Sequence, residues 1–170
     1  KDRIVQAASD WEAQAMGQVR RMAAHLTHLG IQPGDRVAAY LPNVPETIVA
    51  FLACASIGAV WSICAPDMGT NAVLDRFQQI TPKVLIACDG VRYGGRDLDR
   101  MAVVQSLVEA LPTVQHVILH ANLATWEALE SASNSIAGYA RLAGATARND
   151  AETSAFEPLW LPFDHPLWIV

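Results

Sequence analysis

Two arginines and two adjacent glycines lie close together in the stretch DGVRYGGRD, residues 89–97. Glycine tolerates positive φ and lets the backbone approach a ligand closely, which Gly94 and Gly95 would permit. The planar guanidinium groups of Arg92 and Arg96 match the geometry of phosphate. These residues predict an anion-binding loop. A solvated turn that carries two arginines for solubility explains them as well, since the stretch contains neither a GxGxxG nor a GxxxxGK[ST] pattern.

A second candidate is Asp67, in the stretch CAPDMGTN, residues 64–71. This stretch follows a predicted strand, and ligands of open parallel sheets bind beyond the carboxyl ends of the strands. Asp67 could therefore point into a ligand groove. The alternative is a turn that only leads into a helix capped by Thr70.

The histidines do not predict a metal centre. His25 and His28 lie three residues apart, and His116 and His120 flank a predicted strand. No Cys, Asp or Glu cluster completes a metal site around either pair, so we expect no metal ligands in this chain. The GxSxG pattern of a nucleophile elbow is also missing.

The three cysteines are an odd number, lack CxxC spacing and lie in apolar runs. This pattern is typical of reduced thiols in the core of a cytosolic protein. We therefore expect a cytoplasmic protein in which Cys54, Cys64 and Cys88 are structural.

The composition indicates a folded chain with a substantial core. The 170 residues are 52% hydrophobic and suit a single domain, residues 1–170. The net charge of −5 argues against a nucleic-acid partner, because such a partner is bound by clustered Lys and Arg.

The uncharged stretch IVAFLACASIGAVWSICA, residues 48–65, approaches the length of a membrane span. Its composition changes at Gly58, from Ala-rich and helix-compatible to AVWSIC. A buried helix that runs into a buried strand fits this change better, so we expect no membrane partner.

Apolar periodicity divides the first 120 residues into alternating helices and strands. The predicted helices are residues 9–29, with a Ser9/Glu12 capping box, 43–57, 70–81 and 101–111. The predicted strands are residues 36–41, 59–63, 83–88 and 116–120. Because parallel neighbours need a helical return, this alternation predicts an α/β fold with a mostly parallel sheet and helices on both faces.

The rest of the chain is less regular. Residues 121–158 are rich in Ala, Ser, Thr, Asn and Gly, with a short helix expected at TWEALE, residues 125–130, and a flexible surface segment at residues 144–155. The apolar end PLWIV, residues 166–170, suits a buried strand that has lost its neighbour, and we expect the chain to self-associate through it.

Residues 29–90 resemble the acyl-CoA synthetases of the adenylate-forming superfamily, and within them the group that activates acetoacetate. The resemblance covers residues 9 to about 120 and 156–170 and is poor between them, as in a variable insertion. The motifs that carry it are PGDRVAAYLPN, ASIGAVWSICAPDMG, VLDRFQQITPKVL and PFDHPLWIV.

The resemblance implies the first subdomain of an adenylate-forming enzyme, a ligase that uses ATP, CoA and Mg²⁺. The strand at residues 159–170 would lead into the phosphate loop of the ATP site, and the acyl pocket and catalytic lysine would follow. We therefore expect this chain alone to be inactive. In the related acetyl-CoA synthetases two arginines lie near the CoA nucleotide and its 3′-phosphate, and Arg92 and Arg96 match them with one extra residue between.

Two other hypotheses remain open. The first is a ligase for another short acid, such as acetate or propionate, because the resemblance places the acyl pocket outside this chain. The second is a self-standing, flavodoxin-like binding module. A complete module should end in a capped helix or a polar tail, whereas this chain ends in a bare strand.

Overall fold

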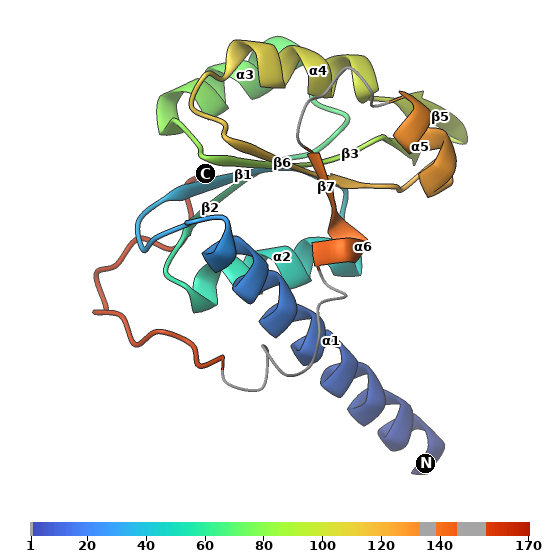
Figure 1. Ribbon diagram of the computed structural model, residues 1–170. Helices are drawn as coiled ribbons and strands as arrows, with labels where there is room; N and C mark the ends of the chain where they lie inside the picture. The colour runs from blue at the N-terminus through green and yellow to red at the C-terminus, as the bar shows by residue number, and fades with distance from the viewer. Residues whose placement is uncertain (1, 133–138, 146–155) are drawn as a thin grey trace.

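A central sheet between two helical layers forms the structure, a computed structural model that describes residues 2–132, 139–145 and 156–170 (Figure 1). Most of the segment predicted to be flexible lies outside these described residues. The sheet has the order β2-β1-β3-β6-β7, and every neighbouring pair is parallel. Its strands are β1 Arg36–Tyr40, β2 Val60–Cys64, β3 Val84–Cys88, β6 His116–His120 and β7 Tyr139–Arg141.

The helices cover both faces of the sheet, which confirms the predicted α/β class. One layer contains α1 Asp2–His28, α2 Pro45–Ser56 and the short α6 Leu142–Ala145. The other contains α3 Thr70–Ile80, α4 Met101–Ala110 and α5 Trp126–Ala132.

The central strand β3 shows why the strands are continuous apolar runs. All five of its residues are buried. Val84, Ile86 and Cys88 join the core under α1 and α2, whereas Leu85 and Ala87 join the core under α3 and α4. Because successive side chains point to opposite faces and both faces are covered, every position must be apolar.

The ends of two helices differ from their predicted ends. Helix α1 begins at Asp2, so the predicted cap at Ser9 is wrong; the preceding residues simply continue the helix. Its other end is as predicted: Gly30 has φ +82°, its N–H donates to Thr27 O and the Ile31 N–H donates to Leu26 O, which is a Schellman motif. Thr70 is the first residue of α3 rather than its cap, because Gly69 occupies the cap position without a side-chain hydrogen bond.

The uncharged stretch at residues 48–65 is a helix followed by a buried strand, as predicted, but the helix buries only one face, and Ile48 and Leu52 on its other face are exposed. Helix α2 ends at Ser56, Gly58 turns the chain with φ +73°, and β2 begins at Val60. Within the described part of the chain, no helix combines the length and apolar character that crossing a membrane requires.

The glycine-rich stretch forms a hairpin rather than the predicted loop. Strands β4 Gly90–Tyr93 and β5 Arg96–Asp99 pair in antiparallel fashion. Gly94 and Gly95 connect them with φ values of +57° and +76°. Positive φ at both central positions is characteristic of a type I′ turn, the tightest connection between two twisted strands.

The apolar end of the chain lies along the outer edge of β2. The Trp61 N–H donates to Leu167 O at 3.0 Å, and the Ile169 N–H donates to Trp61 O at 2.8 Å. Trp168 makes an isolated parallel bridge with Trp61, and the Phe51 ring lies 5.1 Å from the Trp168 ring and 6.0 Å from the Trp61 ring. The predicted buried strand at residues 166–170 is therefore wrong: the segment lies against β2 through a single bridge, and Leu167, Trp168 and Val170 stay exposed, because nothing in the described part of the chain covers them on the side away from β2.

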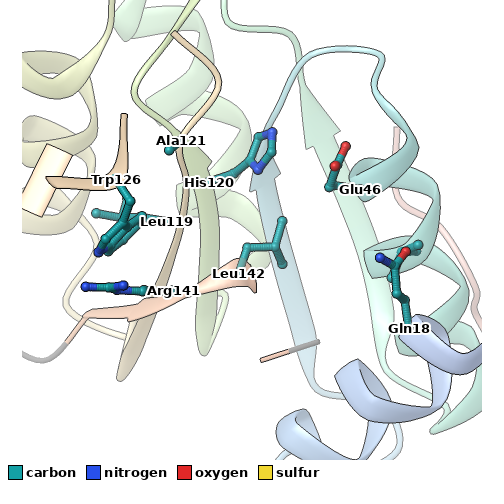
Figure 2. Close-up of a pocket in the computed structure, with 9 residues that line it drawn as sticks. Gln18, Glu46, Leu119, His120, Ala121, Trp126, Arg141 and Leu142 are labelled. Carbon is teal, nitrogen blue, oxygen red and sulfur yellow. The ribbon is translucent and has the colours of Figure 1, made fainter. Parts of the chain in front are cut away.

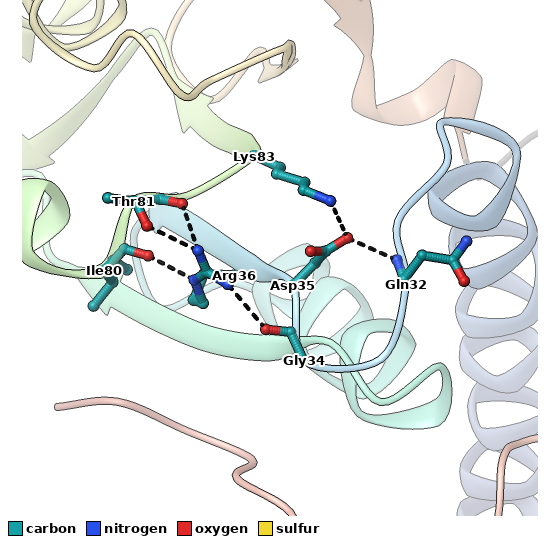
Figure 3. Close-up of polar contacts among 7 residues, drawn as sticks. All are labelled: Gln32, Gly34, Asp35, Arg36, Ile80, Thr81 and Lys83. Atoms are coloured by element: carbon teal, nitrogen blue, oxygen red, sulfur yellow. Dashed lines mark hydrogen bonds and ion pairs between the residues drawn. The ribbon is translucent and has the colours of Figure 1, made fainter.

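A polar cluster lies at the edge of the sheet where the strands begin, and it joins the start of β1 to the end of α3 and the start of β3 (Figure 3). Arg36 donates from Nε to Ile80 O at 2.7 Å and from Nη2 to Thr81 Oγ1 at 2.8 Å and Thr81 O at 3.2 Å. These contacts satisfy the last carbonyls of α3 and hold Thr81 in the left-handed region at φ +47°. Beside them the Lys83 ammonium bonds the Asp35 carboxylate at 2.7 Å.

Replacing Arg36 tests this cluster. Arg36→Ala should lower the free energy of unfolding by about 1.5 to 3 kcal/mol, because several charge-assisted hydrogen bonds are lost and helix carbonyls are left without a donor. Arg36→Lys should recover little, since an ammonium lacks the planar fork. Urea denaturation gives the measurement. Arg76→Ala, on an exposed position of α3, is the matched control, and an equal loss in both alanine variants would contradict this role.

Candidate functional site

The carboxyl edge of the sheet is where the connections place a ligand site. The direction of the connections reverses between the neighbouring strands β1 and β3. From β1 the chain continues to β2, on the side away from β3, whereas from β3 it continues to β6, on the side away from β1. In doubly wound sheets such a reversal opens a crevice in which ligands bind. Tyr40 is the last residue of β1, and Asp89 directly follows β3, so these two buried residues mark the point where the connections diverge.

Arg92 and Arg96 leave this edge on the hairpin β4–β5. Arg92 lies opposite Asp97, and Arg96 lies opposite Tyr93. Since side chains alternate along a strand, the two arginines occupy different faces of the hairpin. The hairpin therefore presents one cation on each side rather than two converging on one point.

Arg92 already binds a carboxylate. Its Nε and Nη2 donate to Asp97 Oδ1 and Oδ2 at 2.6 and 3.0 Å, in the side-on fork that arginine forms with carboxylates. This hydrogen bonding raises the pKa of Arg92 and lowers the pKa of Asp97. The pair is solvent-exposed, with 71% of the Arg92 side chain accessible. An incoming phosphate must bind the Nη1 side of the guanidinium or displace Asp97.

Asp67 occupies an exposed turn at this edge of the sheet. The Met68 N–H donates to Ala65 O at 3.0 Å, which places Asp67 at a central position of the turn. Two side chains bind the backbone of this turn: Pro66 O accepts a hydrogen bond from the Tyr40 hydroxyl at 2.9 Å and another from Arg100 Nε at 2.6 Å. Burial raises the pKa of Tyr40, so its hydroxyl remains a donor at neutral pH. Because Arg100 directly follows the hairpin, the two loops predicted from the sequence are connected to each other.

Asp89 is the residue of this edge whose importance the sequence did not reveal. It is only 5% exposed. Its Oδ1 accepts hydrogen bonds from the backbone N–H groups of Asn122 at 2.7 Å and Leu123 at 3.0 Å, and its Oδ2 accepts one from Ala124 at 2.7 Å. A buried carboxylate is stable when backbone donors replace its water, and here they come from the loop after β6. The signal in the sequence was an acidic residue directly after a fully apolar strand.

A pocket of about 300 Å³ lies nearby, on the α1 and α2 side of this edge (Figure 2). His120 and Glu46 face the same space from β6 and α2, and the Arg141 guanidinium stacks 4.4 Å from the centre of the Trp126 ring. Burial lowers the pKa of His120, although the nearby carboxylates of Glu46 and Asp89 oppose this effect. The imidazole is therefore neutral at pH 7. From the sequence, His120 was considered only as a metal ligand and rejected, and the other pocket residues were not considered as ligand groups.

The cysteines are core residues. All three are buried. Burial raises the pKa of Cys88 to about 12 and also raises the pKa of Cys54 and Cys64, so their reactive thiolates are suppressed. Among the residues that the structure describes, no three His, Cys, Asp or Glu side chains form a group that could hold a metal ion.

A doubly wound sheet with an arginine-bearing hairpin at its carboxyl edge is typical of a nucleotide- or cofactor-binding domain. The chain belongs to the AMP-binding enzyme family, which it matches over residues 13–163. This assignment favours the adenylate-forming hypothesis over a flavodoxin-like module.

Three relatives illustrate the similarity. The chain is 37% identical to the acetoacetyl-CoA synthetase of Xenopus tropicalis over 158 residues, 93% of this chain and 24% of that protein. It is 41% identical to the acetoacetyl-coenzyme A synthetase of Rhizobium meliloti over 152 residues, 89% of this chain and 22% of that protein. The solved structure of acetoacetyl-CoA synthetase from Streptomyces lividans superposes with a TM-score of 0.79 at 44% identity, covering 92% of this chain and 22% of that one. The chain thus spans less than a quarter of the length of these relatives.

The close packing at the base of the hairpin accounts for the glycine at position 90, and a substitution there tests this packing. A Cβ on Gly90 would lie 2.3 Å from Leu98 O and 2.7 Å from Leu123 Cδ1. Gly90→Ala should therefore push β5 and the loop after β6 apart and lower the free energy of unfolding by about 1 to 3 kcal/mol.

Gly17→Ala is the matched control, because Gly17 lies in α1 and a Cβ there meets nothing closer than 3.5 Å. That variant should stabilise the protein by about 0.5 to 1 kcal/mol through helix propensity. Thermal or urea unfolding distinguishes the two signs. A neutral Gly90→Ala would show that the hairpin base is not closely packed.

Proposed function

We propose that the protein is an AMP-forming acid:CoA ligase that activates acetoacetate. Support comes from the family assignment and from relatives named acetoacetyl-CoA synthetases, which are 37 to 41% identical over about nine-tenths of this chain. The single observation that carries the proposal is this identity, because the match spans 152 to 158 of the 170 residues. A ligase for another short acid is the alternative within the same class.

The proposed reaction has two steps. A carboxylate oxygen of acetoacetate attacks the α-phosphorus of ATP, forming the acyl adenylate and releasing pyrophosphate. The CoA thiol, losing its proton, then attacks the acyl carbon and displaces AMP to give the thioester. Mg²⁺ would accompany ATP in the first step.

The described part of this chain fits a contact with the nucleotide end of CoA. Arg92 projects from the hairpin in a defined orientation, because Asp97 binds one side of its guanidinium. We assign Arg92 to the 3′-phosphate of CoA, with Gly94 and Gly95 allowing its close approach. Arg96, on the other face, and Asp67, in the adjoining turn, would contact other parts of the nucleotide.

Substrate use and CoA selectivity test this function together. Formation of the CoA thioester should depend on acetoacetate and ATP, and acetate or propionate should replace acetoacetate poorly. Arg92→Ala should raise the KM for CoA by about fivefold to thirtyfold, since a charge-assisted contact is lost where water screens it. The first step, followed by acetoacetate-dependent ATP–pyrophosphate exchange, should change little.

Dephospho-CoA provides the control for this assignment, since it lacks the 3′-phosphate. The wild type and Arg92→Ala should use it about equally poorly. Arg20→Ala, an exposed arginine of α1, is the matched variant and should leave the KM for CoA unchanged. If Arg92→Ala distinguishes CoA from dephospho-CoA as well as the wild type does, the hairpin is only a solvated turn.

We also propose that the 170-residue chain associates with itself through its apolar end. Trp160 and Phe163 are fully exposed, Val170 is almost fully exposed, and Trp168 is half-exposed beside the edge of the sheet. Such a patch favours a partner that removes it from water. Sedimentation velocity should show concentration-dependent association that the double substitution Trp160→Ser and Phe163→Ser weakens. A monodisperse monomer at high concentration would rule the proposal out.

A further inference from the structure

The hairpin cannot hold its position by itself. It is a two-stranded ribbon whose residues from Arg92 to Asp97 are all exposed, and isolated ribbons of this kind are marginally stable in water. Its orientation at the carboxyl edge must therefore come from contacts at its base, where Gly90 enters and Arg100 leaves.

Both ends of the base are fixed at Asp89. Its backbone carbonyl accepts a hydrogen bond from the Arg100 N–H at 2.7 Å, which closes the hairpin. Its side chain accepts the backbone N–H groups of Asn122, Leu123 and Ala124, all within 3.2 Å. One residue thus joins the hairpin to the loop that follows β6.

Asn122 and Arg100 complete the attachment. Asn122 Nδ2 donates to Gly90 O at 2.8 Å, so the loop after β6 bonds the hairpin backbone directly. Arg100 Nε donates to Pro66 O at 2.6 Å, which fixes the turn containing Asp67 to the other end of the hairpin. Asp89 is buried and Asn122 is partly buried against the hairpin base, which suits groups that support a site rather than contact a ligand.

We infer that Asp89, Asn122 and Arg100 are positioning residues for the nucleotide-binding hairpin. They hold the base of the hairpin against the loop after β6 and the Asp67 turn, and so determine where Arg92 meets the 3′-phosphate. This inference rests on the proposed function of the hairpin. It predicts that loosening the base reduces phosphate selectivity although no ligand-contacting atom is removed.

Asn122→Ala is the decisive variant, because it removes the hydrogen bond to Gly90 O and keeps the backbone donors that hold Asp89. In the protein as its gene encodes it, calorimetry should show about fivefold weaker binding of CoA, because the loosened hairpin must be ordered again when CoA binds. Dephospho-CoA binding should be unchanged. In the same variant, amide hydrogen exchange should accelerate in residues 90–99 and not in β1 or β3.

Two further variants complete the design. Asn71→Ala makes the same substitution at an exposed position of α3 and should change neither binding nor exchange. Asp89→Asn places an amide against backbone donors and should lower CoA selectivity more strongly than Asn122→Ala. If Asp89→Asn does not fold, the binding and exchange measurements on Asn122→Ala decide whether the positioning role is correct.

The outcomes separate the two proposals. If the wild type binds CoA and dephospho-CoA equally, both the phosphate site and its positioning residues are rejected. If Arg92→Ala loses selectivity but Asn122→Ala keeps it, the phosphate site stands and the positioning role is wrong. The same conclusion follows if hairpin exchange accelerates in Asn122→Ala without any loss of selectivity.

Discussion

Parallel strand pairing is the constraint on which the rest of this structure depends. A parallel neighbour requires the chain to return through a helix, so each of the described strands of the main sheet ends at the same edge. The turn around Asp67, the hairpin and the loop after His120 therefore meet there, although they are far apart in the sequence. The order β2-β1-β3-β6 adds the reversal between β1 and β3, the kind of point at which doubly wound sheets bind their ligands.

The same constraint explains how far the fold could be predicted. Strands covered on both faces must be apolar at every position, so runs such as VLIAC in β3 were recognisable. Helix ends are harder to predict, because a residue able to cap a helix does so only where the helix does not extend past it. The residues before Ser9 continue helix α1, and Thr70 is itself the first residue of α3, so neither residue is a cap. The hairpin was missed since its strands are only four residues each, too short for a period to be visible.

The candidate site was predictable in its residue types but not in its pairing. Arginines, glycines and an acidic residue could be selected by their chemistry, and the sheet brought their loops together. Nothing in the sequence, however, states that Arg92 faces Asp97 or that Arg96 lies on the other face, because both follow from the register of a two-residue turn. Asp89 was hidden for a similar reason, since its partners are the backbone donors of residues 122–124, and any residues would supply those.

The charge of the hairpin decides what kind of attraction it can exert. Residues 90–99 contain Arg92 and Arg96 but also Asp97 and Asp99, so the hairpin has no formal net charge, and the chain as a whole carries −5. An anion is consequently not drawn to it by a long-range field. Any affinity must arise at contact distance, where the orientation of one guanidinium group decides whether its donors reach the phosphate oxygens. A site that worked in this way would depend on how rigidly its base is held, and at the base of this exposed hairpin lies the buried Asp89 carboxylate, bound by three backbone N–H groups.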